Sequence, residues 1–222
     1  MEAQGESPAA LEALEKLCRI YWPPVYEFVR RNGIAKEEAQ DLTQGFFALL
    51  LERRDFSAVR REKGRLRSYL LTALKHHMAD ERRRAMAIKR GKGERLIAFE
   101  ELSAEDWSEI ESDAMTADVI YERRWASTLL ERVLNMLKDE YATGETTLLF
   151  ESLTQVLTDE PGAPSRADIA TQLGMTENAV SQALHRFRRR YQSLLREEIA
   201  HTVATTTDID DELHHLIAVI RA

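Results

Sequence analysis

The sequence predicts an all-α protein in which two small helical domains are joined by an acidic linker. Apolar residues recur at spacings of three and four over most of the chain, and no convincing run alternates apolar and polar residues as a strand does. Glycine and proline are sparse and 31% of the residues are charged, a composition typical of helical proteins. Lys and Arg dominate between Arg53 and Arg95, whereas residues 96–122 hold many acids and no Lys or Arg. This change from a basic to an acidic segment predicts the linker.

Periodicity and charge together divide the chain into five expected segments. They are an N-terminal tail (1–10), a first helical domain (11–95), the acidic linker (96–120), a second helical domain (121–199) and a C-terminal amphipathic extension (200–222). In the first domain, Pro23 and Pro24 predict that the segment Leu11–Val29 forms one or two helices broken at "WPPVY", because proline cannot continue a helix begun upstream. Helices at 36–54 and 65–90 follow. The first of these is expected to turn Ala39, Leu42, Phe46, Leu49 and Leu50 toward the core.

Bulk composition excludes several classes of protein. No apolar run approaches the roughly 18 residues that a membrane span needs, and the N-terminus lacks the pattern of a signal peptide. We therefore expect a cytoplasmic protein with no membrane partner. Cys18 is the single cysteine, which excludes an internal disulfide. Metalloprotease, P-loop and hydrolase motifs are absent, and adjacent histidines such as His76 and His77 diverge on a helix. We predict no enzyme activity, no metal site and no cofactor.

The second domain contains the clearest local pattern of the chain. The stretch "SRADIATQLGMTENAVSQALHRFRRR" predicts two helices joined by a tight turn at Gly174. Ser165 and Asp168 form a capping-box pattern, and Thr176 is a natural N-cap for the second helix. Glycine allows the left-handed backbone that such a turn requires. Two short helices, a tight turn and a polar, basic second helix are typical of a helix-turn-helix.

The second of these helices has one apolar face and one basic face. We expect the apolar stripe to consist of Val180, Leu184, Phe187, Tyr191 and Leu194. Off this stripe, Ser181, His185 and Arg186 are predicted to face base edges, and Arg188, Arg189 and Arg190 to hold phosphates, which supply affinity without sequence information. The alternative is that the arginines only keep an ordinary surface helix soluble. The capped turn and the small polar residues at the start of the helix favour DNA binding.

With these motifs in place, the chain resembles the extracytoplasmic-function (ECF) group of the sigma-70 family of bacterial RNA polymerase sigma factors. "AQDLTQGFFALL" is similar to the family's polymerase-binding helix, and "RLRSYLLTALKHHMADERRR" to the helix that follows it. "RADIATQLGMTENAVSQALHRFRRR" resembles the family's helix-turn-helix. The three motifs occur in the family's order and cover about residues 20–200. The resemblance implies a sigma-2-like domain for 11–95 and a sigma-4-like domain for 121–199.

The resemblance also implies partners and site residues. Core RNA polymerase is expected to bind the exposed polar positions Glu38, Asp41 and Gln44. The minus-ten promoter element is expected at a basic loop and the helix after it, through Phe56, Arg60, Arg61, Lys63, Arg67, Tyr69, Lys75 and His76. The minus-thirty-five element is expected at the helix-turn-helix, through Asn178, Ser181, Gln182, His185, Arg186, Arg188 and Arg189. Phe56 and Tyr69 could stack on bases or could belong to the core. In the family, the linker threads the RNA exit path of the polymerase; a plain solvated linker is the alternative.

Departures from the family pattern suggest where regulation could act. Tyr69 and His76 stand where the family usually has Trp and Asn, which leaves the minus-ten preference open. Gln40 and Gly45 each replace a usual Glu, and Thr43 replaces a usual Val. We hypothesise that phosphorylation of Thr43 restores the missing charge; the alternative is a tolerated, half-buried substitution. A Ser/Thr kinase or an anti-sigma protein is therefore a candidate partner.

The C-terminal extension predicts a short amphipathic helix whose apolar face consists of Ile209, Leu213, Leu216, Ile217 and Ile220. This helix could pack on either domain or recruit a regulator.

Two other classes of function remain open from the sequence. The first is a free-standing helix-turn-helix regulator, which would bind a specific duplex without core polymerase. The second is a helical scaffold with no DNA role, for which loss of the Arg186 side chain would have no effect.

Overall fold

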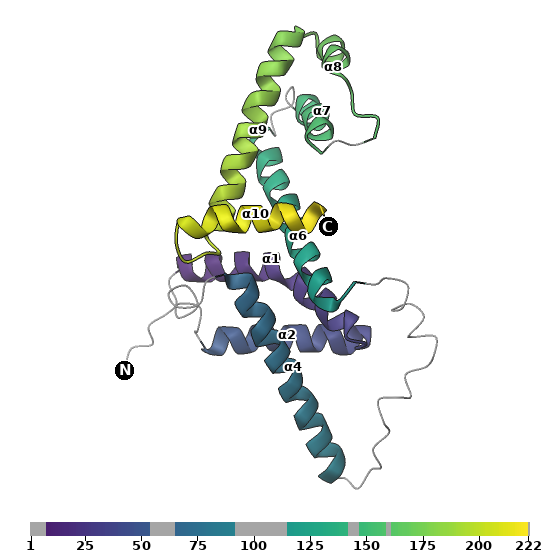
Figure 1. Cartoon of the computed structure of the whole chain (residues 1–222), viewed down its shortest axis with the longest axis vertical. Coiled ribbons are helices and arrows are strands. Elements are labelled where there is room, and N and C mark those ends of the chain that lie inside the picture. Colours follow the sequence, from purple (N-terminus) through teal and green to yellow (C-terminus); the bar gives the residue numbers. More distant parts are fainter. Residues whose placement is uncertain (1–7, 54–64, 92–114, 142–146, 159–160, 222) are drawn as a thin grey trace. The chain divides into compact units, whose positions relative to one another are not determined.

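The computed structural model describes residues 8–53, 65–91, 115–141, 147–158 and 161–221 (Figure 1). Within these ranges the regular structure consists of eight helices and no strand, which confirms the predicted all-α class. None of the described helices combines the length and the apolar composition that crossing a membrane requires. The chain forms two compact units, one of Met1–Thr128 with Thr202–Ala222 and one of Leu129–His201. Most of the predicted acidic linker lies outside the described residues, so that the linker stays a prediction.

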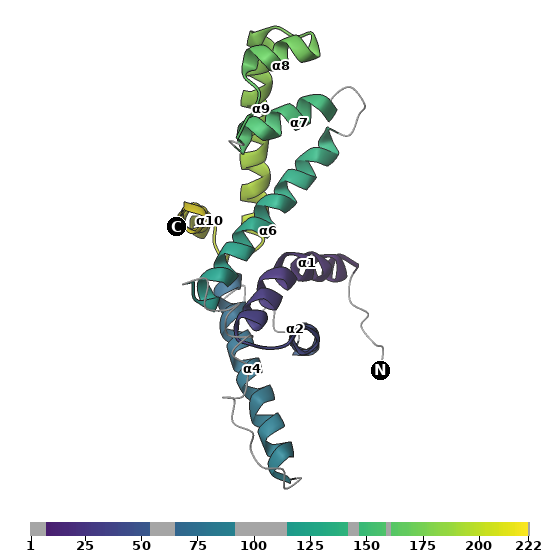
Figure 2. The ribbon, with the colours of Figure 1, turned by 90° about the vertical axis from the view of Figure 1, so that its right-hand side faces the viewer.

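Helix α1 (Pro8–Arg31) runs through both prolines, so the predicted break at "WPPVY" is wrong. Each proline lacks the backbone N–H that a helix uses, which bends a helix without necessarily ending it. Figures 1 and 2 show that the axis of α1 changes direction along its length. The apolar face is continuous across the bend and holds the two halves against the same core. Its buried members are Ile20, Tyr21, Val25, Phe28 and Val29.

Helices α2 (Lys36–Arg53) and α4 (Leu66–Gly91) both pack against α1 and against each other. Acids in the first turn of α2, Glu37 and Glu38, suit the positive end of the helix dipole. The buried face of α2 differs from the expected one, because Thr43 and Phe47 are buried in place of Leu42 and Leu49. Its buried residues are Ala39, Thr43, Phe46, Phe47 and Leu50, whereas Leu42 and Leu49 are only partly buried.

Helix α10 (Thr207–Arg221) belongs to the same unit as α1, α2 and α4, together with the first part of α6 (Ala117–Glu140). It packs through a narrower face than the sequence predicts. Leu216 is buried, but the expected partners Ile217 and Ile220 are exposed. The other fully buried residue of α10 is Glu212, an acid. A buried carboxylate requires a partner, and that partner lies on α4.

The second unit holds the remainder of α6 with α7 (Thr147–Leu157), α8 (Arg166–Leu173) and α9 (Glu177–Ala200). Helices α7 and α8 both contact α9. The rings of Tyr141, Phe150 and Phe187 form a triangle with centroids 5.6–5.9 Å apart, which fixes α7 against α9. At the other end of the unit, Ile169 and Ala170 of α8 pack on Val180 of α9.

The turn between α8 and α9 has the caps that the sequence predicts. Ser165 Oγ accepts a hydrogen bond from the Asp168 N–H, and the Asp168 carboxylate accepts one from the Ser165 N–H, so the capping box is confirmed. Thr176 Oγ1 accepts from the Ala179 N–H at 3.2 Å. Gly174 has φ = 63°, the left-handed conformation expected for it. These contacts fix the angle at which α8 meets α9 (Figure 2).

Candidate nucleic-acid interface

One face of α9 is buried and the opposite face is polar and basic. Val180, Ala183, Leu184 and Phe187 are buried in the unit where α7 and α8 contact α9, and Tyr191 is partly buried. Every residue predicted for the minus-thirty-five contact except Ser181, which is half-buried, is exposed. The exposed residues are Asn178, Gln182, His185, Arg186, Arg188 and Arg189.

Three of these exposed residues are arginines. Among the residues that the structure describes, none forms an ion pair with Arg186, Arg188 or Arg189. Their guanidinium groups therefore face solvent with their hydrogen-bond donors unused, which is the state in which arginine binds phosphate most readily. The first of the three, Arg186, lies nearly three helical turns after the Thr176 cap. The arrangement can bind a polyanion along one side of α9.

Arg190 behaves differently from its neighbours. Its guanidinium donates to both carboxylate oxygens of Glu140 on α6, at 2.6 and 3.0 Å, and lies 3.5 Å from Glu197. These hydrogen bonds lower the pKa of the Glu140 carboxyl below its ordinary value of 4.5. Arg190 thus connects α9 to α6 within the unit, and its predicted role in holding phosphate would have to compete with Glu140.

The predicted minus-ten residues fall into two groups. Phe56, Arg60, Arg61 and Lys63 lie outside the described residues. The other four are on α4: Tyr69 and His76 line a pocket, Lys75 Nζ pairs with Asp118 at 2.7 Å, and Arg67 is 4% exposed. Lys75 and Asp118 are each about half exposed, so this pair is open to solvent and weak. Arg67 is in a very different environment.

Arg67 is the centre of a buried ionic cluster. Its Nε donates to Glu212 Oε1 at 2.6 Å, its Nη1 binds Glu122 of α6, and its guanidinium lies 5.2 Å from the ring centroid of Trp125. Arg65 Nε lies 3.0 Å from Glu212 Oε2. In this conformation the Arg67 guanidinium is fully engaged inside the protein and does not face DNA, which differs from its predicted role.

Neither acid of this cluster was predicted from the sequence. One signal could have identified Glu212: it lies four residues before Leu216, and therefore on the same face of the amphipathic helix. An acid within an apolar face indicates a buried cation elsewhere in the chain. No such signal exists for Glu122, which lies among charged residues.

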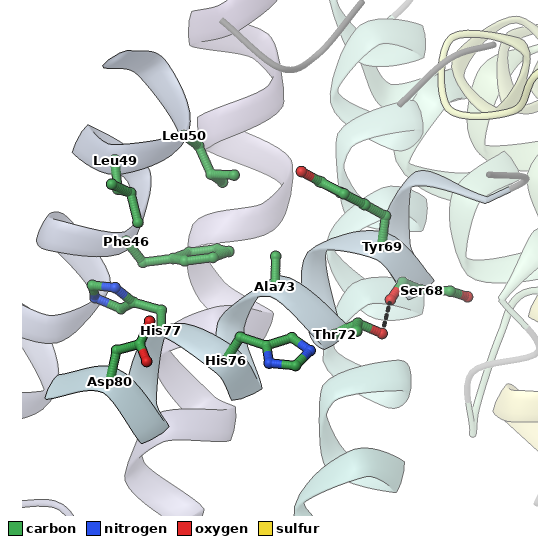
Figure 3. A pocket seen from close by; sticks show the side chains of 10 residues that line it. All are labelled: Phe46, Leu49, Leu50, Ser68, Tyr69, Thr72, Ala73, His76, His77 and Asp80. Carbon is green, nitrogen blue, oxygen red and sulfur yellow. Dashed lines mark hydrogen bonds between the residues drawn. The ribbon is translucent and has the colours of Figure 1, made fainter. Parts of the chain in front are cut away.

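Between α2 and α4 lies a pocket of about 520 Å³ (Figure 3). Its apolar wall consists of Phe46, Leu49 and Leu50 of α2. The α4 wall is mostly polar and consists of Ser68, Tyr69, Thr72, Ala73, His76, His77 and Asp80. The volume is within the usual range of small-ligand pockets, about 300–1,000 Å³.

The two adjacent histidines of α4 point in different directions, as the sequence predicts (Figure 3). His77 points toward α2, where its ring centroid is 5.8 Å from that of Phe46. Its Nε2 is buried and has no hydrogen-bond partner among the described residues. Burial lowers the pKa of His77 below 6.5, against the raising effect of Glu81. His77 is therefore neutral near pH 7 and cannot act as a fixed cation in the pocket.

On α2, Glu38, Asp41 and Gln44 are all exposed at spacings of three, so they share one face of the helix. Thr43 is fully buried, with 0% of its surface exposed, and its hydroxyl donates to the Ala39 carbonyl at 2.7 Å. It is thus more deeply buried than the half-buried position expected from the sequence. A kinase could reach this hydroxyl only if α2 moved away from its neighbours.

Comparisons with protein-family models, with curated proteins and with solved structures gave no match. Within the described parts of the chain, no group of three or more His, Cys, Asp or Glu side chains is arranged to hold a metal ion. The geometry of α9, α2 and the pocket, together with the motif resemblance, therefore carries the functional proposal.

Proposed function

We propose that this chain is an alternative sigma factor of the ECF group, which binds core RNA polymerase in the cytoplasm and directs transcription initiation without catalytic activity of its own. The observation that carries the proposal is the basic face of α9. Three arginines there are exposed and have no acidic partner among the described residues, next to a capped turn built on Gly174. In a chain with a net charge of −7, such a face indicates a specific polyanion partner.

In this proposal α9 is the recognition helix of a helix-turn-helix that enters the major groove at the minus-thirty-five element. Asn178, Gln182 and His185 are exposed on the first turns, where recognition helices contact base edges. Arg186, Arg188 and Arg189 follow and bind the backbone.

The pocket between α2 and α4 supports a second contact with promoter DNA. Leu50 and Ser68, which line it, precede and follow the loop 56–65, which corresponds by resemblance to the loop that captures an unstacked base. Tyr69 offers a ring for stacking, and His76 and Asp80 offer polar groups for the edge of a base. The pocket is therefore a candidate site for a nucleobase of the melted minus-ten element.

For the polymerase, the exposed side of α2 with Glu38, Asp41 and Gln44 is the proposed contact. Phosphorylation of Thr43 could act as a switch only if α2 first separated from the core that it forms with α1 and α4. An anti-sigma protein remains the other candidate regulator.

A free-standing helix-turn-helix regulator is the second candidate. It is favoured by the engagement of Arg67 and Lys75 with acids of the same chain, since a regulator that never melts DNA does not need free cations on α4.

Co-purification with core RNA polymerase distinguishes the two candidates. We expect the wild-type chain to be captured by core polymerase and Asp41→Ala to bind about tenfold more weakly. Glu151→Ala is the matched control, because it removes an exposed carboxylate from α7 in the other unit. Specific duplex binding without capture by core polymerase would support the regulator instead.

A further inference from the structure

The Glu212 carboxylate is bound as a phosphate group would be. Its Oε1 accepts from Arg67 Nε at 2.6 Å, and its Oε2 lies 3.0 Å from Arg65 Nε and 3.4 Å from Arg67 Nη2. Glu212 is 1% exposed, so this acid is held by two guanidinium groups away from bulk solvent. Arginine pairs bind carboxylate and phosphate oxygens with the same fork geometry.

Of the two arginines, Arg67 is held in place by contacts that do not involve α10, whereas the ion pairs of Arg65 are with Asp211 and Glu212 of α10. The Arg67 guanidinium lies over Trp125 and binds Glu122, both on α6, and the Tyr121 hydroxyl donates to the Arg67 carbonyl at 3.1 Å. The Arg67 guanidinium would therefore keep its position if α10 were displaced, and Arg65, two residues away, would lose its α10 acids and become free to bind another anion.

Displacement of α10 would also change the charge of the site. Among the described residues, the acids paired with Arg65 and Arg67 are Glu122 on α6 and Glu212 and Asp211 on α10. With α10 in place, these three acids outnumber the two arginines. Without α10, Glu122 is the one described acid that remains, and the two arginines make the site positive.

The attachment of α10 is shallow for a helix of this length. Glu212 and Leu216 are its only fully buried residues, and Ile217 and Ile220 are exposed. In the segment before it, the Thr202 carbonyl accepts a hydrogen bond from the Leu66 N–H at 3.0 Å. Helix α10 also contacts α6 through His215, whose Nε2 lies 3.0 Å from Glu122 Oε2. A competing anion thus needs to replace the Glu212 carboxylate, the Leu216 contact and this His215 contact.

We propose that Arg65 and Arg67 form a binding site for a backbone phosphate of single-stranded nucleic acid, and that Glu212 occupies this site in the free protein. Helix α10 is then an autoinhibitory element, which leaves when the strand binds. The identity of the strand as melted promoter DNA rests on the proposed function, whereas the masking of the two arginines does not.

The test is the affinity of the full chain for a fluorescent single-stranded DNA oligonucleotide, measured over a series of salt concentrations. Glu212→Gln keeps the shape of the side chain and removes the competing charge. We expect about tenfold tighter binding, and a plot of log affinity against log salt that is steeper by about 0.7 for each phosphate gained. Glu151→Gln, an exposed acid on α7, is the matched control and is expected to bind as the wild type does.

A reversal experiment separates masking from a merely structural role of Glu212. Adding Arg65→Ala to Glu212→Gln should abolish the gain, because Arg65 is one of the two proposed phosphate ligands and is itself partly exposed. Unchanged affinity in folded Glu212→Gln, or a gain that persists after Arg65→Ala, would overturn the proposal.

Leu216→Ala provides a second variant, in case Glu212→Gln does not fold. It loosens α10 without touching the charges, and we expect it also to raise affinity for the oligonucleotide; no rise would refute the masking. Core polymerase capture is measured in parallel. If the variants bind the oligonucleotide more tightly but the chain is not captured by core polymerase, the masked site is supported and the sigma-factor proposal is rejected. If the chain is captured but the variants bind the oligonucleotide no more tightly, the sigma-factor proposal is supported and the masked site is rejected.

Discussion

The arginines of α9 and Arg67 at the start of α4 both come from basic stretches of sequence, but their environments differ completely. Arg186, Arg188 and Arg189 are exposed, and no described residue pairs with them. Arg67 is 4% exposed and binds Glu122 and Glu212, the second of which is 145 residues away in sequence. A run of positive charge therefore does not by itself show whether the cations are free to bind a ligand. This depends on whether acids from distant parts of the sequence pair with them in the fold.

The largest expected difference between the two regions is in stability. Arg67→Ala leaves the buried Glu212 carboxylate with its main partner removed, and we expect the free energy of unfolding to fall by about 3–5 kcal/mol. Arg186→Ala removes an exposed, unpaired side chain and should change the free energy of unfolding by no more than about 0.5 kcal/mol. Urea unfolding followed by circular dichroism measures both. Similar losses for the two variants would contradict the contrast.

A carboxylate placed in the core without an arginine partner tests how much the pairing of Glu212 with arginine matters. Thr43 is as buried as Glu212, but its hydroxyl bonds only the Ala39 carbonyl. Thr43→Glu should therefore lower the free energy of unfolding by about 3 kcal/mol or more. Thr43→Val, which loses only the hydroxyl, should cost about 1 kcal/mol or less. A Thr43→Glu protein as stable as the wild type in thermal melts would show that α2 opens readily enough for phosphorylation.

Within α9, two neighbouring arginines allow a narrower test. Arg189 is exposed and unpaired among the described residues, whereas Arg190 is held by Glu140. Arg189→Ala should reduce the slope of log affinity against log salt for duplex DNA by about 0.9, the value of one phosphate contact. Arg190→Ala should leave that slope nearly unchanged. Equal reductions would mean that Arg190 exchanges Glu140 for phosphate on binding.

The smallest expected effect concerns the pH dependence of the Arg190–Glu140 pair. Because Arg190 lowers the pKa of Glu140 below 4.5 in the folded state, the pair stabilises the protein above that pH. This contribution is lost as the pH falls through the lower, folded-state pKa. The difference in thermal midpoint between wild type and Glu140→Gln should thus be small at pH 7 and vanish in acid. A difference that grows below pH 4.5 would have the wrong sign.

Local features of the fold could be predicted because nearby residues determine them. The caps at Ser165 and Thr176 and the left-handed Gly174 each depend on atoms within a few residues, and the structure has all three.

Features that depend on distant packing could not be predicted. Pro23 and Pro24 bend α1 without breaking it, because a continuous buried face holds both halves. The pairing of Arg67 with Glu212 depends on how the end of the chain packs on α4, which no local pattern specifies. For the candidate site, the sequence therefore identified the exposed residues of α9 but not the state of the cations on α4.

Run-off transcription with core RNA polymerase and genomic DNA fragments tests the central proposal most directly. We predict that adding the wild-type chain yields RNA from defined start sites, and that Arg186→Ala abolishes most of this RNA while the protein remains folded. The absence of any defined start site with the wild-type chain, under conditions in which core polymerase itself is active, would contradict the proposal.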